Sequence, residues 1–461
     1  MNFLKKINRE NIYSIIAIVL ILITYLSYIF NTHMYSKPEK VIRFADIWIY
    51  YSYLPATFVE KDYKLQFLSN PDAANRHMYS YTTAPNEGRV IKTSMGIAIM
   101  YSPFFFIAHA LAEKTGYKAD GYTVPYAFAL LISCVFYLAF GFFFLRALLL
   151  KYFKDKIVAI TLIIIGVATN LLWYAIRSAP MSHGYSFALF CVFLYLMEKW
   201  HEKQGWGITV FIGLITGLIS LIRPTNGLIV IVFLLYNITK LKDIKPRVQL
   251  FLKNYWKIIV MIIGVFLVWL PQLLYWKSIT GEWFFYSYTD ERFFFNDPKF
   301  LLVLFSFKKG WLIYTPTMLF AIIGIGMLWK TNTKYFYPVL LFFIINLYII
   351  SCWWCWWYGG GFGMRSLIES YAILAIPLAT FLTWVAKQKL LIRIPLYIIV
   401  LAISAQSIFH CIQYHYGAIH VADMTKEAYF DSFWRVKPSK EFKSLLRQTN
   451  SEAAKKGDRN L

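Results

Sequence analysis

The hydrophobic residues of this chain gather in runs that are long enough to cross a membrane. An α-helix rises about 1.5 Å per residue, so about 20 apolar residues span the hydrocarbon core of a bilayer. The pattern therefore predicts an all-α, polytopic membrane protein with about eleven transmembrane helices in residues 1–412. The runs lie near residues 12–30, 122–148, 157–176, 183–200, 206–221, 226–240, 257–276, 311–330, 335–351, 366–386 and 394–412.

A further run, residues 94–112, is also apolar enough to cross, and its placement reverses the orientation of every later loop. Lys and Arg are enriched in the cytoplasmic loops of membrane proteins. If residues 94–112 lie on the outer surface, most loop Lys and Arg residues fall inside, although the outer loop 277–310 is basic too. We therefore expect the N-terminus inside, an outer loop of residues 31–121 with membrane-lying helices, and an outer basic tail of residues 413–461.

Composition narrows the class of protein. Of the 461 residues, 59% are hydrophobic and 15% are charged, which excludes an ordinary soluble globular domain. The net charge of +23 resides mostly in residues that bracket the apolar runs, so no nucleic-acid partner is expected. The chain has no Gly-x-x-x-x-Gly-Lys loop, dinucleotide fingerprint or His-Glu-x-x-His motif. Because most unusual polar clusters fall on the outer face, where nucleotide pools are absent, we expect the function there.

The segment of residues 43–58 is predicted to be a helix on the outer membrane surface. Asp46, Tyr50 and Tyr53 share one face at helical spacing. A carboxylate among aromatic side chains at a membrane surface can accept a proton, whereas a solvated pair with Arg43 is the alternative. The apolar stripe of this helix comprises Ile47, Tyr51, Leu54 and Phe58.

Residues 351–365 form the second strong pattern. Three consecutive glycines and Gly363 permit a close approach of backbone or ligand, and Arg365 follows at the outer end of the next apolar run. An arginine beside a helix N-terminus is disfavoured by the helix dipole unless an anion is shared, so Arg365 is a candidate for binding phosphate. The alternative is an aromatic membrane belt with a snorkelling arginine. Cys352 and Cys355 are expected to pack, or to form a strained disulfide.

Three further polar clusters face the same side. His183 stands at the outer edge of a run, either in a structural hydrogen bond or as a ligand contact. Arg223 begins a possible Pro-Asn turn, yet it has no acidic neighbour in the sequence and so invites an anion. For Asp290 and its neighbours the default interpretation is a solvated loop.

Taken together, these segments resemble the GT-C superfamily of integral membrane glycosyltransferases, which use polyprenyl-phosphate sugars. The resemblance covers about residues 1–412 and includes bacterial enzymes that modify the cell envelope. One departure is that Ile47, not a glutamate, follows Asp46, which argues against protein mannosylation. The resemblance to the GT-C superfamily rests on the segments Asp46–Tyr51, Lys92–Gly96, Arg223–Asn226, Gly310–Pro316 and Gly359–Arg365.

The resemblance implies roles for individual residues. Asp46 would be the catalytic base, and Arg365, Lys92 and Arg223 would bind the donor phosphate. It implies a polyprenyl-phosphate sugar donor, a glycolipid, glycan or protein acceptor, and the bacterial cytoplasmic membrane, without assigning metal ligands or a cofactor. A lipid-linked glycan flippase or other transporter is the alternative, although charged residues are scarce in the middle of the runs. The expected substrate contacts are Tyr50, Tyr53, His183, Tyr288, Asp290 and Tyr358.

Overall fold

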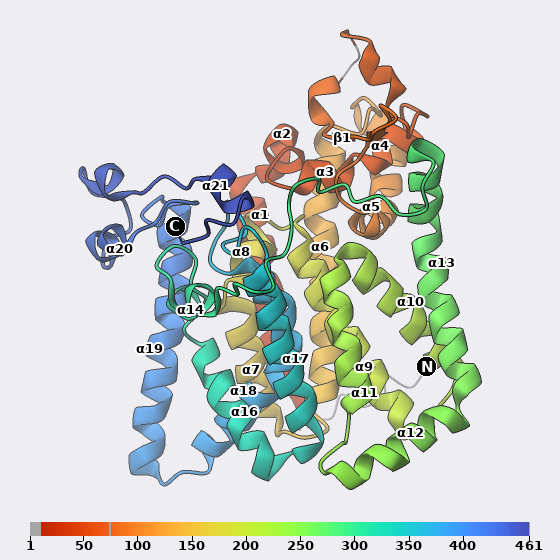
Figure 1. Ribbon diagram of the computed structural model, residues 1–461. Coiled ribbons are helices and arrows are strands. Elements are labelled where there is room, and N and C mark those ends of the chain that lie inside the picture. Colours follow the sequence, from red (N-terminus) through yellow and green to blue (C-terminus); the bar gives the residue numbers. More distant parts are fainter. Residues whose placement is uncertain (1–10, 73–74, 461) are drawn as a thin grey trace.

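Long apolar helices run beside one another through the body of the molecule, as the computed structural model shows for residues 11–72 and 75–460 (Figure 1). Helices make up most of the described chain, and its one sheet pairs strands β1 Thr82–Thr83 and β2 Arg89–Val90. This confirms the expected all-α class. The long and mid-length helices are α1 Ile12–Thr32, α5 Gly96–Ala112, α6 Val124–Leu149, α7 Asp155–Val167, α9 Ser182–Glu202, α10 Trp206–Ile222, α12 Ile244–Lys253, α13 Tyr255–Thr280, α16 Met318–Thr331, α17 Thr333–Cys352, α18 Tyr371–Ala386 and α19 Leu390–His415.

Shorter helices connect or extend these elements. The short α-helices are α2 Pro38–Ile42, α3 Ile47–Tyr51, α4 Tyr53–Phe58, α8 Leu171–Ile176, α11 Val230–Leu235, α14 Phe300–Phe305, α15 Trp311–Tyr314, α20 Lys426–Ser432 and α21 Ser451–Lys455. The 3-10 helices are Met34–Ser36, Gln66–Ser69, Arg76–Met78, Glu113–Thr115, Pro224–Ile229, Leu241–Asp243, Arg365–Ser370 and Phe442–Leu445.

Helices occupy all eleven predicted runs, but several are too short to cross a membrane as single elements. The predicted run 157–176 divides into α7 and α8, and the run 311–330 divides into α15 and α16. Seven helical segments of the described chain are long and apolar enough to cross, and one of these includes α5. The structure thus shows a membrane protein with seven candidate spans, and it does not establish the count of eleven.

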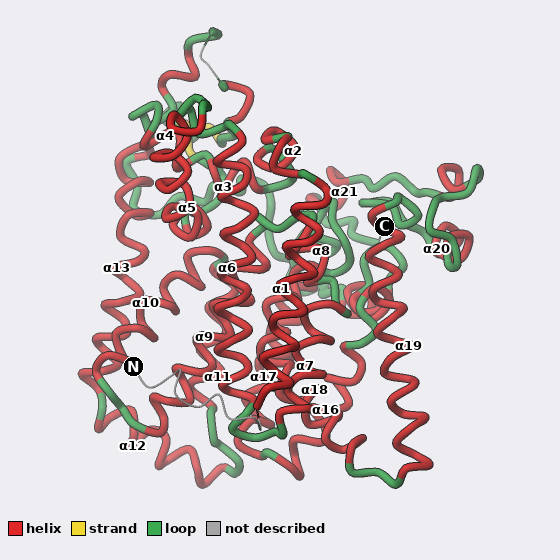
Figure 2. Tube along the Cα trace, turned by 180° about the vertical axis from the view of Figure 1, so that it is seen from behind, coloured by secondary structure: helices red, strands yellow, loops and turns green. Residues whose placement is uncertain are grey.

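Helix α5 lies differently from the other long helices. In Figures 1 and 2 it is seen nearly end-on, whereas α1, α6 and α13 run along the length of the bundle. It packs against α6 and against α3, at the end of the bundle that also carries α2 and α4. An apolar helix that runs across one end of a bundle has the geometry expected of a membrane-lying helix.

The predicted helix over residues 43–58 forms as two consecutive short helices, α3 and α4. Ser52 joins them in helical conformation, and its hydroxyl donates to the Trp48 carbonyl oxygen at 2.7 Å. Both faces of these helices are buried, since Tyr50 and Tyr53 are covered as well as Ile47 and Leu54. Phe58, expected in the apolar stripe, is the last residue of α4 and is partly exposed, although its ring packs against that of Phe106 at 4.8 Å.

Helix α18 is the centre of the bundle. It is buried along nearly its whole length and packs against α16, α7 and α9, as expected of a helix that is apolar on every side. Small residues let neighbouring backbones approach closely: a Cβ added at Gly324 of α16 would collide with the backbone of Pro377 of α18. Close packing through glycine is typical of helices in membranes.

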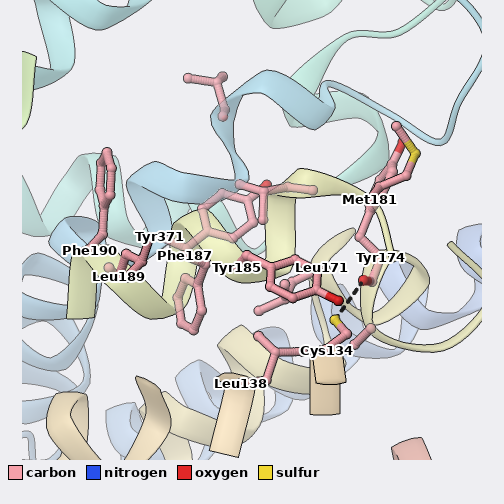
Figure 3. Close-up of a cluster of buried hydrophobic side chains, with 14 of the residues drawn as sticks. Cys134, Leu138, Leu171, Tyr174, Met181, Tyr185, Phe187, Leu189, Phe190 and Tyr371 are labelled. Atoms are coloured by element: carbon pink, nitrogen blue, oxygen red, sulfur yellow. Dashed lines mark hydrogen bonds between the residues drawn. The ribbon is translucent and has the colours of Figure 1, made fainter. Parts of the chain in front are cut away.

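Aromatic side chains fill the contact between α6, α8 and α9 (Figure 3). Cys134 of α6 donates a long hydrogen bond to the carbonyl oxygen of Tyr174, at 3.8 Å, and Tyr185 and Leu138 lie beside it. Gly184 has no room for a side chain, because an added Cβ would lie 2.9 Å from Cys134 Sγ. This packing fixes α8, and with it Tyr174, beneath the end of the bundle that carries α2 to α5. We call this end the outer end, after the orientation expected from the sequence.

The C-terminal tail folds back onto the loop of residues 351–365. Arg459 is fully buried, and its guanidinium donates to the carbonyl oxygens of Asp297, Ser351 and Trp353 at 2.5, 2.5 and 2.9 Å. Trp356 returns a hydrogen bond to the Arg459 carbonyl oxygen at 3.0 Å. The tail is therefore an ordered part of the outer end, beside the glycine-rich loop.

Candidate functional site

Asp46 and Arg365 meet at the outer end of the bundle, although they are far apart in the sequence. Arg365 Nη2 lies 3.3 Å from Asp46 Oδ2, and the Asp46 side chain is 39% exposed while that of Arg365 is 11% exposed. Asp46 precedes α3, and Ala45 before it has φ 49°, a left-handed conformation that alanine adopts at an energetic cost. Arg43 instead stacks over the Trp48 ring at 5.7 Å, so the partner of Asp46 is Arg365 and not Arg43.

The glycine-rich loop positions Arg365 through two glycines with different roles. Gly363 has φ 57°, in the left-handed region that favours glycine. Gly361 lies so close to α8 that an added Cβ would stand 2.7 Å from Tyr174 Oη. The Tyr174 hydroxyl accepts a hydrogen bond from the Phe362 backbone N–H at 3.0 Å. The run of glycines is therefore needed to bring the loop, and Arg365 with it, against Tyr174.

A buried carboxylate joins two other candidate residues. Glu369 Oε1 lies 3.2 Å from Arg223 Nη1 and 3.0 Å from His183 Nδ1. Arg223 is extended because it precedes Pro224, and this ends α10 and directs the arginine inward. Burial opposes the charge of Arg223, but the adjacent Glu369 carboxylate raises its pKa. Arg223 has no acidic neighbour in the sequence, and the fold supplies one from a distant segment.

Lys92 lies at the edge of the same region, paired with a different acid. Its Nζ is 2.5 Å from Glu291 Oε1 and 5.2 Å from the centre of the Tyr288 ring. Burial raises the pKa of Tyr288, and its titration is also influenced by Tyr50, Arg223 and Asp46. Tyr288 thus connects Lys92 with the Asp46 region.

Tyr50 lies among the charged groups of the cluster. Burial raises the pKa of Tyr50, Asp46 raises it further, and the nearby Arg223 and Arg365 oppose the shift. Tyr358 adjoins Arg223 and Glu369 in the same way, and burial raises its pKa. We call Asp46, Tyr50, Arg223, Arg365, Glu369, His183, Tyr288 and Tyr358 the outer polar cluster.

Two of the residues expected to contact the substrate, Tyr53 and Asp290, lie outside the outer polar cluster and have other partners. Tyr53 donates its hydroxyl to the Thr93 carbonyl oxygen at 2.7 Å and packs against Tyr275, so it fastens α4 to the loop before α5. Asp290 lies 3.3 Å from Lys455 Nζ on α21 and is 58% exposed. It belongs to the contact between the outer loop and the tail, and the neighbouring Glu291 takes the position beside Lys92.

Two residues of this region were not predicted. Glu369 was overlooked, although an acid within an apolar run is itself a signal for a functional or paired position. Lys309 is almost fully buried, and its ammonium donates to the carbonyl oxygens of Gly361 and Val421. Burial, then the nearby charge of Arg365, lowers the pKa of Lys309 to about 7. Its sequence context, Lys308-Lys309 before Gly310, resembles an ordinary basic loop.

Several polar atoms of the cluster retain unused hydrogen-bonding capacity. Arg365 Nε, His183 Nε2 and Glu369 Oε2 are buried and have no hydrogen-bond partner among the described residues. Buried polar groups are usually satisfied, so unpaired ones that converge on one place indicate capacity for a further ligand.

Cys352 and Cys355 are free and buried, so the described structure contains no disulfide between them. Within residues 11–72 and 75–460, no group of three or more His, Cys, Asp or Glu side chains is arranged to hold a metal ion. An apolar pocket of about 510 Å³ lies between α5 and α6, lined by residues such as Phe104, Leu111 and Phe128. It shares no residue with the outer polar cluster.

No protein-family model matches the chain, and no curated protein sequence matches it.

Proposed function

We propose that this protein is a GT-C-type membrane glycosyltransferase. It would move a sugar from a polyprenyl-phosphate donor to a hydroxyl of a glycolipid, glycan or protein acceptor, on the outer face of the bacterial cytoplasmic membrane. The observation that supports this proposal is the pairing of one partly exposed carboxylate, Asp46, with one largely buried guanidinium, Arg365. A transferase whose donor already carries a phosphate leaving group needs one base and one cationic clamp, without a separate general acid.

In the proposed reaction the donor phosphate replaces Asp46 as the partner of the Arg365 guanidinium. The Arg365–Asp46 contact is a single one of 3.3 Å, and the buried Arg365 Nε has no partner in the described chain, so the guanidinium can accommodate a second anion. Arg223 and Lys92 would add positive charge from either side, each held in place by its own carboxylate. Glu369 and Glu291 would then be positioning residues.

Asp46, released from Arg365, would accept the proton of the acceptor hydroxyl. The acceptor oxygen forms its bond to the anomeric carbon while the bond from that carbon to the phosphate oxygen breaks, with inversion at the carbon. The electron pair and negative charge pass to the polyprenyl phosphate, which Arg365 stabilises. Tyr50 and Tyr288, which interact electrostatically with Asp46 and Arg223, would contact the sugar.

The proposal is tested with the full-length protein in proteoliposomes that contain a labelled polyprenyl-phosphate sugar. We expect a new glycosidic product, and we expect Arg365→Gln to raise the KM for the donor at least tenfold. Arg435→Gln is the matched control, because Arg435 is an exposed arginine of the tail, and it should leave KM unchanged. Movement of the donor across the bilayer without a new glycosidic bond would contradict the proposal and favour a transporter.

A further inference from the structure

A second pocket, lined in part by polar side chains, lies at the outer end, between the C-terminal tail and the chain that follows α14. Its volume is about 390 Å³, within the range of roughly 300–1,000 Å³ that is usual for small-molecule sites. It shares no lining residue with the outer polar cluster. The pocket is lined by Leu302, Ser306, Phe307, Lys308, Met424, Thr425, Lys426, Glu427, Arg447 and Gln448.

Cations outnumber acids in the lining. Lys308, Lys426 and Arg447 contribute positive charge, and Glu427 is the one acidic lining residue. In the described ranges of the chain, no carboxylate lies within ion-pair distance of any of the three cations. The nearby Asp423 carboxylate is engaged by Thr449, whose N–H and hydroxyl donate to it at 3.0 and 2.8 Å. The pocket therefore has an excess of positive charge.

Lys308 is the least exposed of these cations. It is only 7% exposed, and its ammonium group lies 4.6 Å from the centre of the Trp357 ring. Burial lowers the pKa of Lys308 to about 8, Arg447 acts in the same direction, and Asp423 opposes them. A buried ammonium without an ion-pair partner is costly, and an anion in the pocket would reduce that cost.

Exposed aromatic side chains lie on and just beyond α20, and the centre of the Phe430 ring is 5.6 Å from that of the pocket-lining Phe307. Phe430 on α20 is 57% exposed and Trp434, just beyond this helix, is 79% exposed. In Figures 1 and 2, α20 stands to the side of the bundle, beside the upper end of α19. Aromatic residues beside cations are typical of protein surfaces at the headgroup level of a membrane.

We propose that this pocket is a second anion site, which binds a phosphate group through Lys308, Lys426 and Arg447. Arginine and lysine together are well suited to phosphate, the first through its planar fork and the second as a compact charge. The phosphate belongs either to the headgroup of an anionic lipid in the outer leaflet or to free phosphate. The site does not depend on the glycosyltransferase proposal.

Binding is measured with the purified full-length protein in neutral detergent, by titration with phosphatidylglycerol, with inorganic phosphate, and with diacylglycerol, which lacks the phosphate. We expect Lys426→Gln/Arg447→Gln to weaken binding of the phosphate-bearing probe at least tenfold. Both residues are exposed, so the fold should persist. The matched control, Lys437→Gln/Lys440→Gln, removes two exposed tail charges outside the pocket and should bind as the wild type does.

Binding of phosphatidylglycerol but not of inorganic phosphate would support the site and identify a lipid headgroup as the ligand. Binding of both probes, each weakened by the pocket variant, would support the site and show that phosphate alone suffices. The proposal is overturned if the wild type binds neither probe, if diacylglycerol binds equally well, or if the pocket variant binds like the wild type.

Discussion

Arg365 Nη2 lies 3.3 Å from Asp46 Oδ2, which joins the first outer loop to the start of the central helical segment of the bundle. The sequence indicates the two residues as separate candidates, one as a base and one as a phosphate ligand. Their contact brings the two candidates together. In the proposed mechanism a donor phosphate must therefore compete with Asp46 for Arg365, and this competition can be tested.

The fit of Gly361 against Tyr174 gives a first prediction. Gly361→Ala should reduce transfer at least tenfold, because the new Cβ would stand 2.7 Å from Tyr174 Oη and displace the loop that carries Arg365. Tyr174→Phe removes the obstructing oxygen, so the double variant should regain part of the lost activity. Transfer rates of the two single variants and the double variant measure this.

Gly326→Ala is the control for that experiment, since an added Cβ in helix α16 meets nothing within 4 Å. It should leave transfer unchanged and stabilise the helix by up to about 1 kcal/mol. Full activity of Gly361→Ala would show that the loop does not need the close approach.

The Arg223–Glu369 pair predicts a strong coupling in stability. Glu369→Gln leaves Arg223 without its carboxylate, and removal of one partner of a buried pair costs roughly 3–5 kcal/mol. Arg223→Gln/Glu369→Gln removes both charges, so it should cost less than the sum of the single variants. Thermal unfolding in detergent measures the difference, with Glu452→Gln, in an exposed pair with Lys455, as a control expected to change little. Additive losses would show that the pair is not coupled.

Lys309 predicts a dependence of stability on pH. Its pKa is about 7 in the fold, lowered by burial and by Arg365 from the ordinary value of 10.5, with Lys308 adding to the shift and Cys355 and Asp423 opposing it. Since the unfolded chain binds the proton more tightly, this group makes the fold more stable as pH rises from about 7 toward 10.5. Below pH 7 Lys309 is protonated in both the folded and the unfolded state, so its contribution to the free energy of unfolding no longer changes with pH.

The melting temperature of the wild type relative to Lys309→Met, followed from pH 6 to pH 9, isolates this contribution. We expect the difference to be flat below pH 7 and to shift in favour of the wild type above it. A difference in melting temperature that is constant from pH 6 to pH 9 would mean that the pKa of Lys309 is not lowered in the fold.

The sequence was sufficient to locate helices at the apolar runs and to select Asp46, Arg223, His183 and Arg365, because periodicity, isolated charges and glycine runs are local signals. It could not supply the partners. Glu369 stands out as an acid in an apolar run, but its pairing with Arg223 and His183 is visible only in the fold. Likewise, only the fold shows that Glu291 pairs with Lys92 and that Asp290 pairs with Lys455. Such pairings depend on contacts between distant segments, which hydrophobic patterns do not encode.

Helix length was the other point that patterns could not settle. The predicted run 157–176 is apolar on both sides of Thr169 and Asn170, and the chain bends at these two residues, between α7 and α8. Asn170 accepts a hydrogen bond from the Tyr371 hydroxyl at 2.5 Å, so tertiary contacts with the central helix stabilise the break. Tyr174 on α8 is thereby directed to the glycine-rich loop.

The most direct test of the central claim is the turnover of Asp46→Asn, measured in the same preparation as its affinity for polyprenyl phosphate. The substituted amide would keep the size of the side chain, but it could not serve as a base, and without a negative charge it would compete only weakly for Arg365. We predict that transfer falls at least 100-fold, as expected for loss of a general base, while polyprenyl phosphate binds as tightly as to the wild type or more tightly. Asp290→Asn, which changes an acid outside the cluster, should alter neither quantity. Undiminished transfer by Asp46→Asn would contradict the account.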